Sequence, residues 1–308
     1  MNVLVTGGCG YLGSVIVGRL LTEGHDVTVL DSMLFGNSKL AHTLVGEVTD
    51  TKRLSKALDD KDAVVHLASI VGEGACNLFK ETAVRVNYIA TRSLATICKE
   101  RSIKLLFAST ASVYGVSKST EALNEQGALW PLSVYALTKL AAEDFIRSCC
   151  QDYVIFRLGT LHGISKRMRF DLAINRFIAK GAAKEEIMVF GGAQRRPFIH
   201  VRDACEFFTK ALEAGKQGLF NLGGDNYRII DIANIISRRF GTHVSVLPEL
   251  RDPRDYEIDS TLAVRTFKVR PERTVEDSIK EIVPFVATVD YRDSKFNNEE
   301  WLRNLWSH

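Results

Sequence analysis

The sequence places a tyrosine four residues before a lysine three times, at Tyr114/Lys118, Tyr135/Lys139 and Tyr291/Lys295. On a helix, residues four apart share one face, so the lysine ammonium lies near the phenol and lowers its pKa. Such a phenol can act as a base near neutral pH. Only Tyr135 and Lys139 fall in a helical pattern, which follows Pro131 and continues into an alanine-rich amphipathic stretch. We therefore predict that this pair is catalytic.

A glycine-rich segment lies between a predicted strand, 2–6, and a predicted helix, 11–24. It reads Thr6-Gly7-Gly8-Cys9-Gly10-Tyr11-Leu12-Gly13. Glycines at 7, 10 and 13 permit a tight turn and a close backbone approach to a pyrophosphate, which would sit on free N–H groups at the helix N-terminus. A plain turn is the alternative. Asp31 ends the next predicted strand, where a carboxylate binds the adenosine ribose hydroxyls and repels a 2′-phosphate. These features favour NAD over NADP.

Strand-like and helix-like segments alternate through the first half of the chain. The predicted strands are 2–6, 26–32, 63–69, 104–110 and 153–159, and the predicted helices between them are 11–24, 84–102 and 134–150. This spacing is typical of right-handed βαβ units and a parallel sheet. We predict an α/β fold with a Rossmann-type doubly wound sheet over 1–160, to which 197–223 returns. The remainder, 161–196 and 224–308, is predicted to form a smaller, mostly C-terminal substrate-binding portion.

Composition restricts the possible partners. The 308 residues carry 40 Lys+Arg and 37 Asp+Glu, and this net charge of +3 does not indicate a nucleic-acid binder. Apolar runs end well short of a membrane span, and the N-terminus does not resemble a signal peptide. The six cysteines lack CxxC and Cys/His zinc spacings, so we expect neither a metal nor a disulfide scaffold. A cytoplasmic protein is expected.

Basic residues concentrate after the predicted Rossmann half. Residues 161–210 hold ten basic side chains and five acidic ones, a local charge of +5. A small anionic ligand would be attracted to such a segment, and the fork-shaped guanidinium of arginine suits bidentate phosphate contacts. Surface ion pairs are the alternative for any one of these arginines.

Several motifs together resemble the extended short-chain dehydrogenase/reductase family. They are the glycine loop, Asp31, the segment Ser109-Thr110-Ala111-Ser112-Val113-Tyr114-Gly115, and Tyr135 with Lys139. Within that family, the chain is similar to the NAD-dependent sugar-nucleotide epimerase/dehydratase group, which includes UDP-galactose 4-epimerase. The resemblance extends over nearly the whole chain.

The resemblance implies a role for each matching position. Tyr135 would be the proton acceptor, Lys139 its electrostatic partner and a ligand of the nicotinamide ribose, and Thr110 the hydroxyl that bonds the reacting sugar oxygen. Further cofactor contacts would come from Gly7, Gly10, Tyr11, Leu12, Gly13, Asp31, Ser32, Asn37, Ser38, Glu47, Val48, Leu67, Ala68, Ser69 and Asn87. Substrate contacts would come from Thr110, Thr160, Asn175, Arg196 and Arg254.

The implied activity is epimerisation of a nucleoside-diphosphate sugar, at C4, by transient oxidation to a keto-sugar and return of hydride. Two positions depart from the family pattern. Ala111-Ser112 stands where dehydratases carry an Asp-Glu pair, which disfavours dehydration, and Thr160 stands where asparagine is common. A nucleotide-sugar dehydrogenase, reductase or decarboxylase is the alternative within the family, and a catalytically silent NAD-binding regulatory protein is the alternative from another class. The resemblance also implies a homodimer formed through helices near 84–100 and 134–150.

Overall fold

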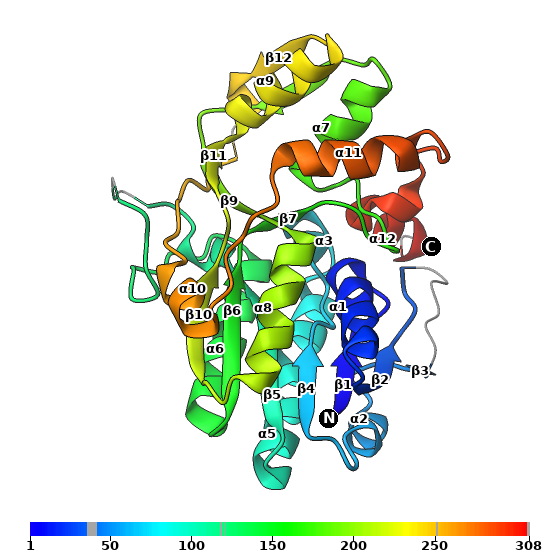
Figure 1. Ribbon diagram of the computed structural model, residues 1–308, viewed down its shortest axis with the longest axis vertical. Coiled ribbons are helices and arrows are strands. Elements are labelled where there is room, and N and C mark those ends of the chain that lie inside the picture. Colours follow the sequence, from blue (N-terminus) through cyan, green and yellow to red (C-terminus); the bar gives the residue numbers. More distant parts are fainter. Residues whose placement is uncertain (36–41, 118, 120, 251, 307–308) are drawn as a thin grey trace.

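The computed structural model describes residues 1–35, 42–117, 119, 121–250 and 252–306. Within these ranges, seven strands form one sheet in the order β10-β6-β5-β4-β1-β2-β3 (Figure 1). Every neighbouring pair in this sheet is parallel. Its strands are β1 (Asn2–Thr6), β2 (Asp26–Asp31), β3 (Thr43–Val45), β4 (Ala63–His66), β5 (Lys104–Thr110), β6 (Tyr153–Leu158) and β10 (Gly218–Leu222). The predicted Rossmann-type fold class is confirmed.

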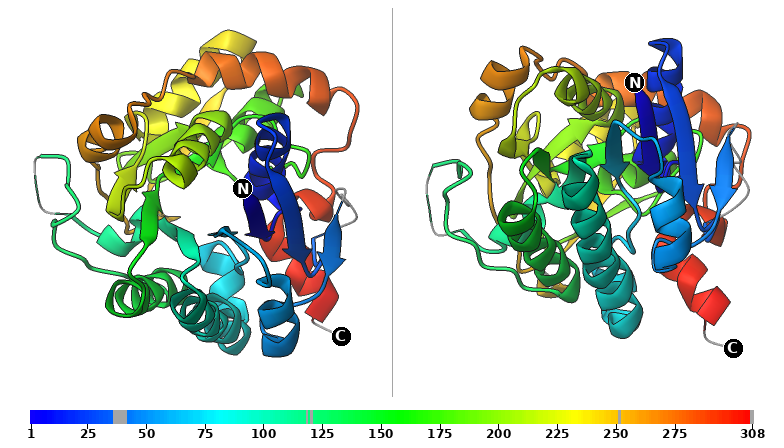
Figure 2. Two further views of the ribbon diagram at one scale, coloured as in Figure 1. Left: turned by 60° about the horizontal axis from the view of Figure 1, so that its bottom comes forward. Right: turned by 90° about the horizontal axis from the view of Figure 1, so that it is seen from below.

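Two helix layers cover this sheet (Figure 2). Helices α1 (Tyr11–Thr22) and α8 (Val201–Glu213) lie on one face, and α2 (Thr51–Ala57), α5 (Ala90–Arg101) and α6 (Val134–Cys149) lie on the other. Strand residues alternate between the two faces. Val3 and Val5 belong to the core under α1, whereas Leu4 belongs to the core under α5 and α6. Burial on both faces explains why these strands are continuously apolar.

The second part of the chain lies over the carboxyl ends of the strands (Figure 1). Strands β7 (Thr160–His162), β9 (Arg195–His200) and β11 (Asn226–Arg228) form one small sheet, and β8 (Ile187–Phe190) pairs with β12 (Val244–Leu247). Helices α7 (Ala173–Ala182), α9 (Ile229–Phe240) and α11 (Val275–Val286) pack around them. Strand β10 returns to the large sheet beside β6. The division at residue 160 stays a prediction.

Shorter elements complete the described chain. They are α3 (Glu73–Leu78), α4 (Lys80–Val84), the π-turn η1 (Arg85–Ile89), the 3-10 turns η2 (Ala111–Tyr114), η3 (Pro248–Leu250) and η4 (Ser294–Phe296), α10 (Thr261–Phe267) and α12 (Asn298–Trp306). The predicted helix over 84–102 is therefore interrupted by a π-turn before α5. Helix α12 packs against α3, which brings the end of the described chain back to the Rossmann half. Among the described ranges, every helix is too short or too polar to cross a bilayer.

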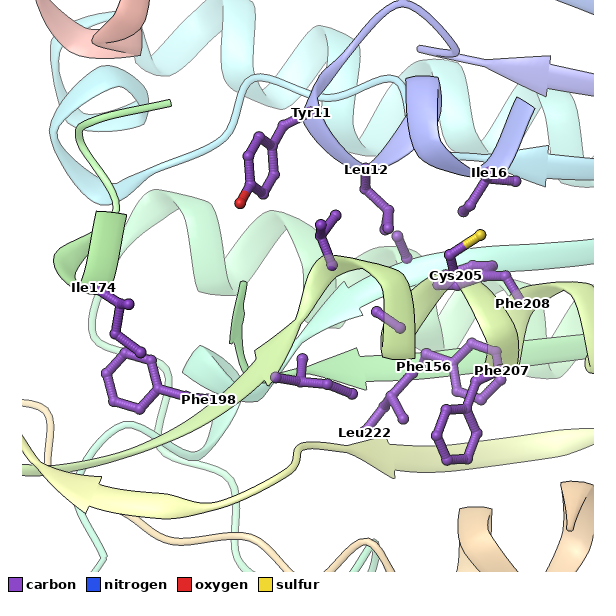
Figure 3. Close-up of a cluster of buried hydrophobic side chains, with 14 of the residues drawn as sticks. Tyr11, Leu12, Ile16, Phe156, Ile174, Phe198, Cys205, Phe207, Phe208 and Leu222 are labelled. Carbon is purple, nitrogen blue, oxygen red and sulfur yellow. The ribbon is translucent and has the colours of Figure 1, made fainter. Parts of the chain in front are cut away.

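An aromatic core joins the large sheet to α8. The ring centroid of Phe156 on β6 lies 4.9 Å from that of Phe208 and 6.4 Å from that of Phe207 (Figure 3). The same core continues to Tyr11 at the start of α1 and to Ile174 on α7. Since Ile174 belongs to the second part of the chain, the two parts share one hydrophobic core. This shared core packs the two parts of the chain against each other.

Candidate active site

A cleft of about 710 Å³ opens at the carboxyl ends of the large sheet. Its walls include residues at or just after the ends of β1, β2, β4, β5 and β6, together with segments of the second part of the chain. Ligands of doubly wound sheets bind at this edge. The cleft is therefore the candidate site, and both parts of the chain build it.

The glycine loop forms one wall of the cleft. A Cβ on Gly13 would lie 2.2 Å from the carbonyl oxygen of Gly7, and a Cβ on Gly7, whose φ is +71°, would lie 2.7 Å from the backbone nitrogen of Ala68. Only glycine fits at these two positions. Helix α1 starts at Tyr11, and no side chain caps its N-terminus. Its first N–H groups are thus available to an anion, as a pyrophosphate requires.

Asp31 lies beside this loop at the end of β2. Its carboxylate accepts hydrogen bonds from the backbone N–H groups of Cys9, at 2.9 Å, and Met33, at 2.8 Å. Burial raises the pKa of Asp31 above its ordinary value, although these hydrogen bonds oppose the rise. Each carboxylate oxygen keeps lone-pair capacity for a ribose hydroxyl. The glycine cradle and this oriented carboxylate therefore fit NAD.

Tyr135 and Thr110 meet at the centre of the cleft. Thr110 ends β5, where its hydroxyl accepts a hydrogen bond from the backbone N–H of Ser112 at 3.1 Å and starts the turn η2. Its hydroxyl also lies close enough to the Tyr135 phenol, which comes from α6, to lower the pKa of that phenol. Ser133 caps this helix by accepting from the N–H of Ala136, which fixes the first turn that carries Tyr135. The structure thus brings the predicted base and the predicted hydroxyl together.

Lys139 lies one turn after Tyr135 on α6. Its Nζ donates to the carbonyl oxygen of Ala108 at 2.9 Å and lies 4.8 Å from the ring centroid of Phe107. Burial lowers the pKa of Lys139 to about 8. Burial also raises the pKa of Tyr135, and the hydrogen bond from Thr110 does not offset this effect. The expected lowering of the phenol pKa is therefore wrong for this structure, because desolvation outweighs the nearby cations.

A buried ion pair lies one helical turn beyond Lys139 on α6. Glu143 follows it by one helical turn, and the Glu143 Oε2 lies 2.7 Å from Nη2 of Arg157 on β6. Arg157 also donates to the Tyr114 hydroxyl at 3.0 Å, and that hydroxyl donates to Asn221 at 2.7 Å. Tyr114, one of the alternative tyrosines, is thus a structural residue. Charged residues inside otherwise apolar segments were the sequence signal for this pair.

The remaining tyrosine–lysine spacings do not form a second site. Lys118, the partner expected for Tyr114, lies outside the described residues. The Tyr291 hydroxyl donates to Glu185 at 2.6 Å, and Lys295 pairs with Asp293 at 2.8 Å. Tyr291 and Lys295 therefore have separate local partners, and neither lines the cleft.

Two predicted substrate arginines lie at the end of the cleft near Tyr135, and both are paired. Arg254 Nη2 lies 2.6 Å from Asp252 Oδ2, and Arg254 Nη1 lies 2.7 Å from Glu73 Oε1. Arg196 Nη2 lies 3.0 Å from the same Asp252 oxygen. Although burial pushes the pKa of Asp252 upward, hydrogen bonds and the charge of Arg254 lower it to about 2. The arginines face the cleft inside a compensated network.

Asn175 takes a different place from the one expected. Its side chain is completely buried, and it lies outside the cleft lining. The amide accepts from the backbone N–H of Gly163 at 3.0 Å and donates to the Tyr11 hydroxyl and the Arg169 carbonyl, each at 3.0 Å. The interpretation of Asn175 as a diphosphate ligand is corrected, because every polar atom of its amide is engaged in holding Tyr11 and its surroundings.

Asn87 also lies behind the cleft, as the resemblance implied. Its Oδ1 accepts from Ser69 Oγ at 2.9 Å and from the Ile70 N–H at 2.8 Å. The other predicted site residues that line the cleft are Gly7, Gly10, Tyr11, Leu12, Gly13, Asp31, Ser32, Glu47, Val48, Leu67, Ala68, Ser69, Thr110, Tyr135, Lys139, Thr160, Arg196 and Arg254. Asn37 and Ser38 lie outside the described residues.

Several residues that line the cleft were not predicted from the sequence. They come from the segment before α7 and from α3, the loop after β2 and the last described helix: Phe35, Glu73, Arg167, Arg169, Asp171, Asn298 and Trp306. Trp301, on the same helix as Trp306, donates from Nε1 to the Leu34 carbonyl at 2.6 Å and so ties α12 to the loop after Asp31. The run from Arg167 to Asp171, with three charged residues in five, was the available signal.

Fold and site together define an NAD-dependent enzyme of the extended short-chain dehydrogenase/reductase class. Residues 3–223 match the model of the NAD dependent epimerase/dehydratase family. The match covers more than half of the chain, and the protein belongs to this family. NAD is accordingly its cofactor, and its activity is of the nucleotide-sugar epimerase or decarboxylase type.

Curated relatives and solved structures agree with this assignment. The chain is 28% identical over 319 residues to an uncharacterised UDP-glucose epimerase, YtcB, of Bacillus subtilis (strain 168), covering 94% of this chain and 99% of the relative. It is 28% identical to a UDP-N-acetyl-alpha-D-glucosaminuronate decarboxylase of Bacillus cytotoxicus, covering 74% and 76%. It superposes with a TM-score of 0.81, at 27% identity and coverages of 94% and 99%, on the UDP-glucuronic acid 4-epimerase of Bacillus cereus in complex with UDP-glucuronic acid and NAD.

Proposed function

We propose that the protein epimerises a nucleoside-diphosphate sugar at C4 through a keto-sugar intermediate. The observation that carries the proposal is the meeting of Tyr135, Thr110 and Lys139 beside the glycine loop in one cleft. UDP-sugars are the first substrates to test, because the relatives named above act on them or bind them.

The residues have distinct tasks in this mechanism. Thr110 holds the reacting sugar oxygen, and Tyr135 accepts the proton of that hydroxyl. When bound, NAD supplies the hydride acceptor and later the hydride donor. Tyr135 acts as a phenolate when it accepts this proton and as a phenol when it returns one to the keto oxygen. Burial raises the pKa of Tyr135 and favours the phenol, whereas the charge of Arg169 favours the phenolate. Arg196 and Arg254 line the cleft and would bind the diphosphate of the sugar nucleotide.

Two features support epimerisation of a neutral sugar. Ala111 and Ser112 follow Thr110 and offer no acid–base pair for loss of water. Glu73 lies close enough to Tyr135 for its charge to raise the phenol pKa, and one of its carboxylate oxygens is buried without a hydrogen-bond partner. The carboxylate of a uronic acid would meet this second carboxylate, whose charge is only partly offset by its ion pair with Arg254, and like charges at close range cost free energy.

Decarboxylation of a nucleotide uronate is the second candidate, because one relative is named as a decarboxylase. Oxidation at C4 by the same Tyr135, Lys139 and Thr110 would precede loss of CO₂. Incubation with UDP-glucuronic acid separates the two reactions, since a decarboxylase releases CO₂ and an epimerase returns a C4 epimer of unchanged mass. A regulatory NAD-binding protein would do neither.

The test is a panel of nucleotide sugars incubated with the purified protein and NAD, with products resolved by chromatography and NMR. We expect inversion at C4 without net change in absorbance at 340 nm. Tyr135→Phe should lower kcat at least about 10²-fold, because it removes the proton acceptor, and should leave NAD binding unchanged. Activity fully retained by Tyr135→Phe would contradict the mechanism.

We also propose a cytoplasmic homodimer. Apolar side chains are exposed on the faces of η1 and α6 where the resemblance implied an interface: Ile89 is 50% and Leu137 52% exposed. Free thiols at Cys76, Cys98, Cys149, Cys150 and Cys205 support a reducing compartment. Sedimentation equilibrium of wild-type protein and Leu137→Glu tests the interface, since a dimer through α6 would dissociate in the variant.

A further inference from the structure

Arg167 is fixed over the start of α1 by the segment that precedes α7. The Ser165 hydroxyl donates to the Tyr11 carbonyl at 2.6 Å and lies 2.9 Å from the Ser14 hydroxyl. The Tyr11 hydroxyl in turn donates to the Gly163 carbonyl at 2.6 Å. These contacts join residues 163–165 to both sides of the first turn of α1. Arg167 follows two residues later and lines the cleft beside the glycine loop.

The Arg167 guanidinium is buried, and among the described residues no carboxylate lies within ion-pair distance of it, although the charges of Asp171 and Asp31 act on it from farther away. The residue is only 7% exposed, and none of the described residues forms an ion pair with it. Its Nε is buried without a hydrogen-bond partner, and Nη2 reaches only the Lys295 carbonyl, at 3.4 Å. The guanidinium carbon lies 4.8 Å from the ring centroid of Phe35. Donors of a planar fork therefore remain available inside the cleft.

Such an arrangement is costly unless an anion occupies the cleft. Burial lowers the pKa of Arg167 to about 10, with the charge of Arg169 adding to the effect. An arginine at this pKa still keeps its proton at neutral pH, so the charge cannot be removed by deprotonation. A buried cation is stabilised by an anion with several acceptor oxygens. A phosphate group meets this requirement.

Neighbouring residues place Arg167 at the cofactor end of the cleft. Phe35, over which it lies, belongs to the loop after Asp31, and the charges of Asp31 and Arg167 influence each other's pKa. Arg196 and Arg254 lie at the other end, in the network of Asp252 and Glu73. We propose that Arg167, from the second part of the chain, binds the pyrophosphate of NAD together with the N–H groups of the glycine loop.

The basic segment 161–210 then contributes to cofactor binding through Arg167. Its charge was expected to attract a small anionic ligand. Through Arg167, part of this charge would bind the cofactor and couple the second part of the chain to NAD. Because the pyrophosphate would contact both α1 and the segment before α7, cofactor binding would hold the two walls of the cleft together. This inference concerns NAD alone and does not depend on which sugar is turned over.

The experiment compares Arg167→Gln with Lys166→Gln in full-length protein stripped of cofactor. Lys166 is the adjacent residue, carries the same charge, is exposed and does not line the cleft. Calorimetric titrations use NAD, ADP-ribose, adenosine, NADP and UDP. Arg167→Gln should weaken NAD and ADP-ribose about 10- to 100-fold, as expected for loss of a charge-assisted hydrogen bond. Affinities for adenosine and UDP should stay within about twofold, as should every affinity of Lys166→Gln.

Thermal unfolding provides a readout that a structural role would not give. Without ligand, Arg167→Gln should unfold at the same or a higher temperature than wild type, because it removes an uncompensated buried charge, and saturating NAD should raise its Tm less. Arg167→Lys should lie between the two, since it keeps the charge and loses the fork. A lower Tm without ligand combined with unchanged NAD affinity would overturn the proposal. So would loss of UDP binding with NAD affinity retained, or an effect on NADP alone.

Discussion

The two ends of the cleft contain buried arginines in opposite electrostatic states. We call the end of the cleft near Tyr135 the sugar end, because we propose that the sugar nucleotide binds there. At the sugar end, Arg196 and Arg254 share Asp252, and Arg254 also binds Glu73. At the cofactor end, Arg167 has no carboxylate within ion-pair distance among the described residues. The charges of Arg196 and Arg254 are balanced by carboxylates of the protein, whereas we propose that the charge of Arg167 is balanced by an anionic ligand. Whether a guanidinium is available to bind an anionic ligand therefore depends on the carboxylates near it. A count of basic residues does not show this.

A fourth arginine, Arg157, has its charge paired with a carboxylate that is also buried. Arg157 is 2% exposed and its partner Glu143 is fully buried, so neither has access to water. Their pairing positions α6 against β5 and β6 below the catalytic residues. Arg157, Arg254 and Arg167 thus form a series from a fully buried ion pair, through a partly exposed one, to no carboxylate within ion-pair distance among the described residues.

The largest effect is expected when the fully paired arginine loses its partner. Glu143→Ala leaves Arg157 as an uncompensated buried charge, and the free energy of unfolding should fall by about 3–5 kcal/mol. Asp144→Asn is the matched control on the same helix, since the Asp144 side chain is 66% exposed and lies 3.9 Å from Arg147. The control should change stability by less than about 1 kcal/mol. Urea unfolding measures both, and equal losses would contradict the series.

Lys139 gives the next largest effect, because it is a buried cation that can lose its proton. Its pKa is lowered by burial from 10.5 to about 8 in the folded protein. Between these values the unfolded chain binds the proton and the folded chain does not, so stability rises with pH. Relative to Lys139→Met, the wild-type protein without cofactor should gain on the order of 3 kcal/mol between pH 7 and pH 10.5. A pH-independent difference in urea unfolding would contradict the buried-cation interpretation.

Local patterns were sufficient to predict the Rossmann-type fold and the presence of Tyr135 and Lys139 together at the cleft. The glycine loop, Asp31, Thr110, Tyr135 and Lys139 each lie at a strand end or on a helix, so sequence spacing determines their positions. Helical context also distinguished Tyr135, which lines the cleft, from the alternative tyrosines at 114 and 291, which do not. Their hydroxyls bind Asn221 and Glu185 in the structure.

Tertiary contacts determine what the sequence could not predict. Asn175 looked like a substrate ligand, but its partners Tyr11 and Gly163 are brought to it by packing between distant segments. Likewise, the resemblance implied a substrate contact for Arg254 and no role for Arg167, but neither segment indicated which of the two arginines is paired. Only the folded chain shows that Glu73, far away in sequence, reaches Arg254 and that no described carboxylate reaches Arg167 within ion-pair distance.

The smallest stability effect, and the sharpest test of the comparison, comes from removing the carboxylate at the sugar end. Asp252→Asn makes Arg196 resemble Arg167 and leaves Arg254 paired with Glu73 alone, since it keeps the size of the side chain and removes its charge. Asp252 is 32% exposed, so the free energy of unfolding should fall by only about 1 kcal/mol.

The same substitution should strengthen UDP binding several-fold, because a diphosphate no longer competes with Asp252 for the two guanidinium forks. Asp290→Asn is the control, at an exposed aspartate paired with Arg292 at 3.6 Å outside the cleft, and should leave UDP affinity unchanged. Titration calorimetry with UDP measures the effect. Weaker UDP binding by Asp252→Asn would mean that the carboxylate orients the arginines for the diphosphate, and that pairing at the sugar end prepares the site for its ligand.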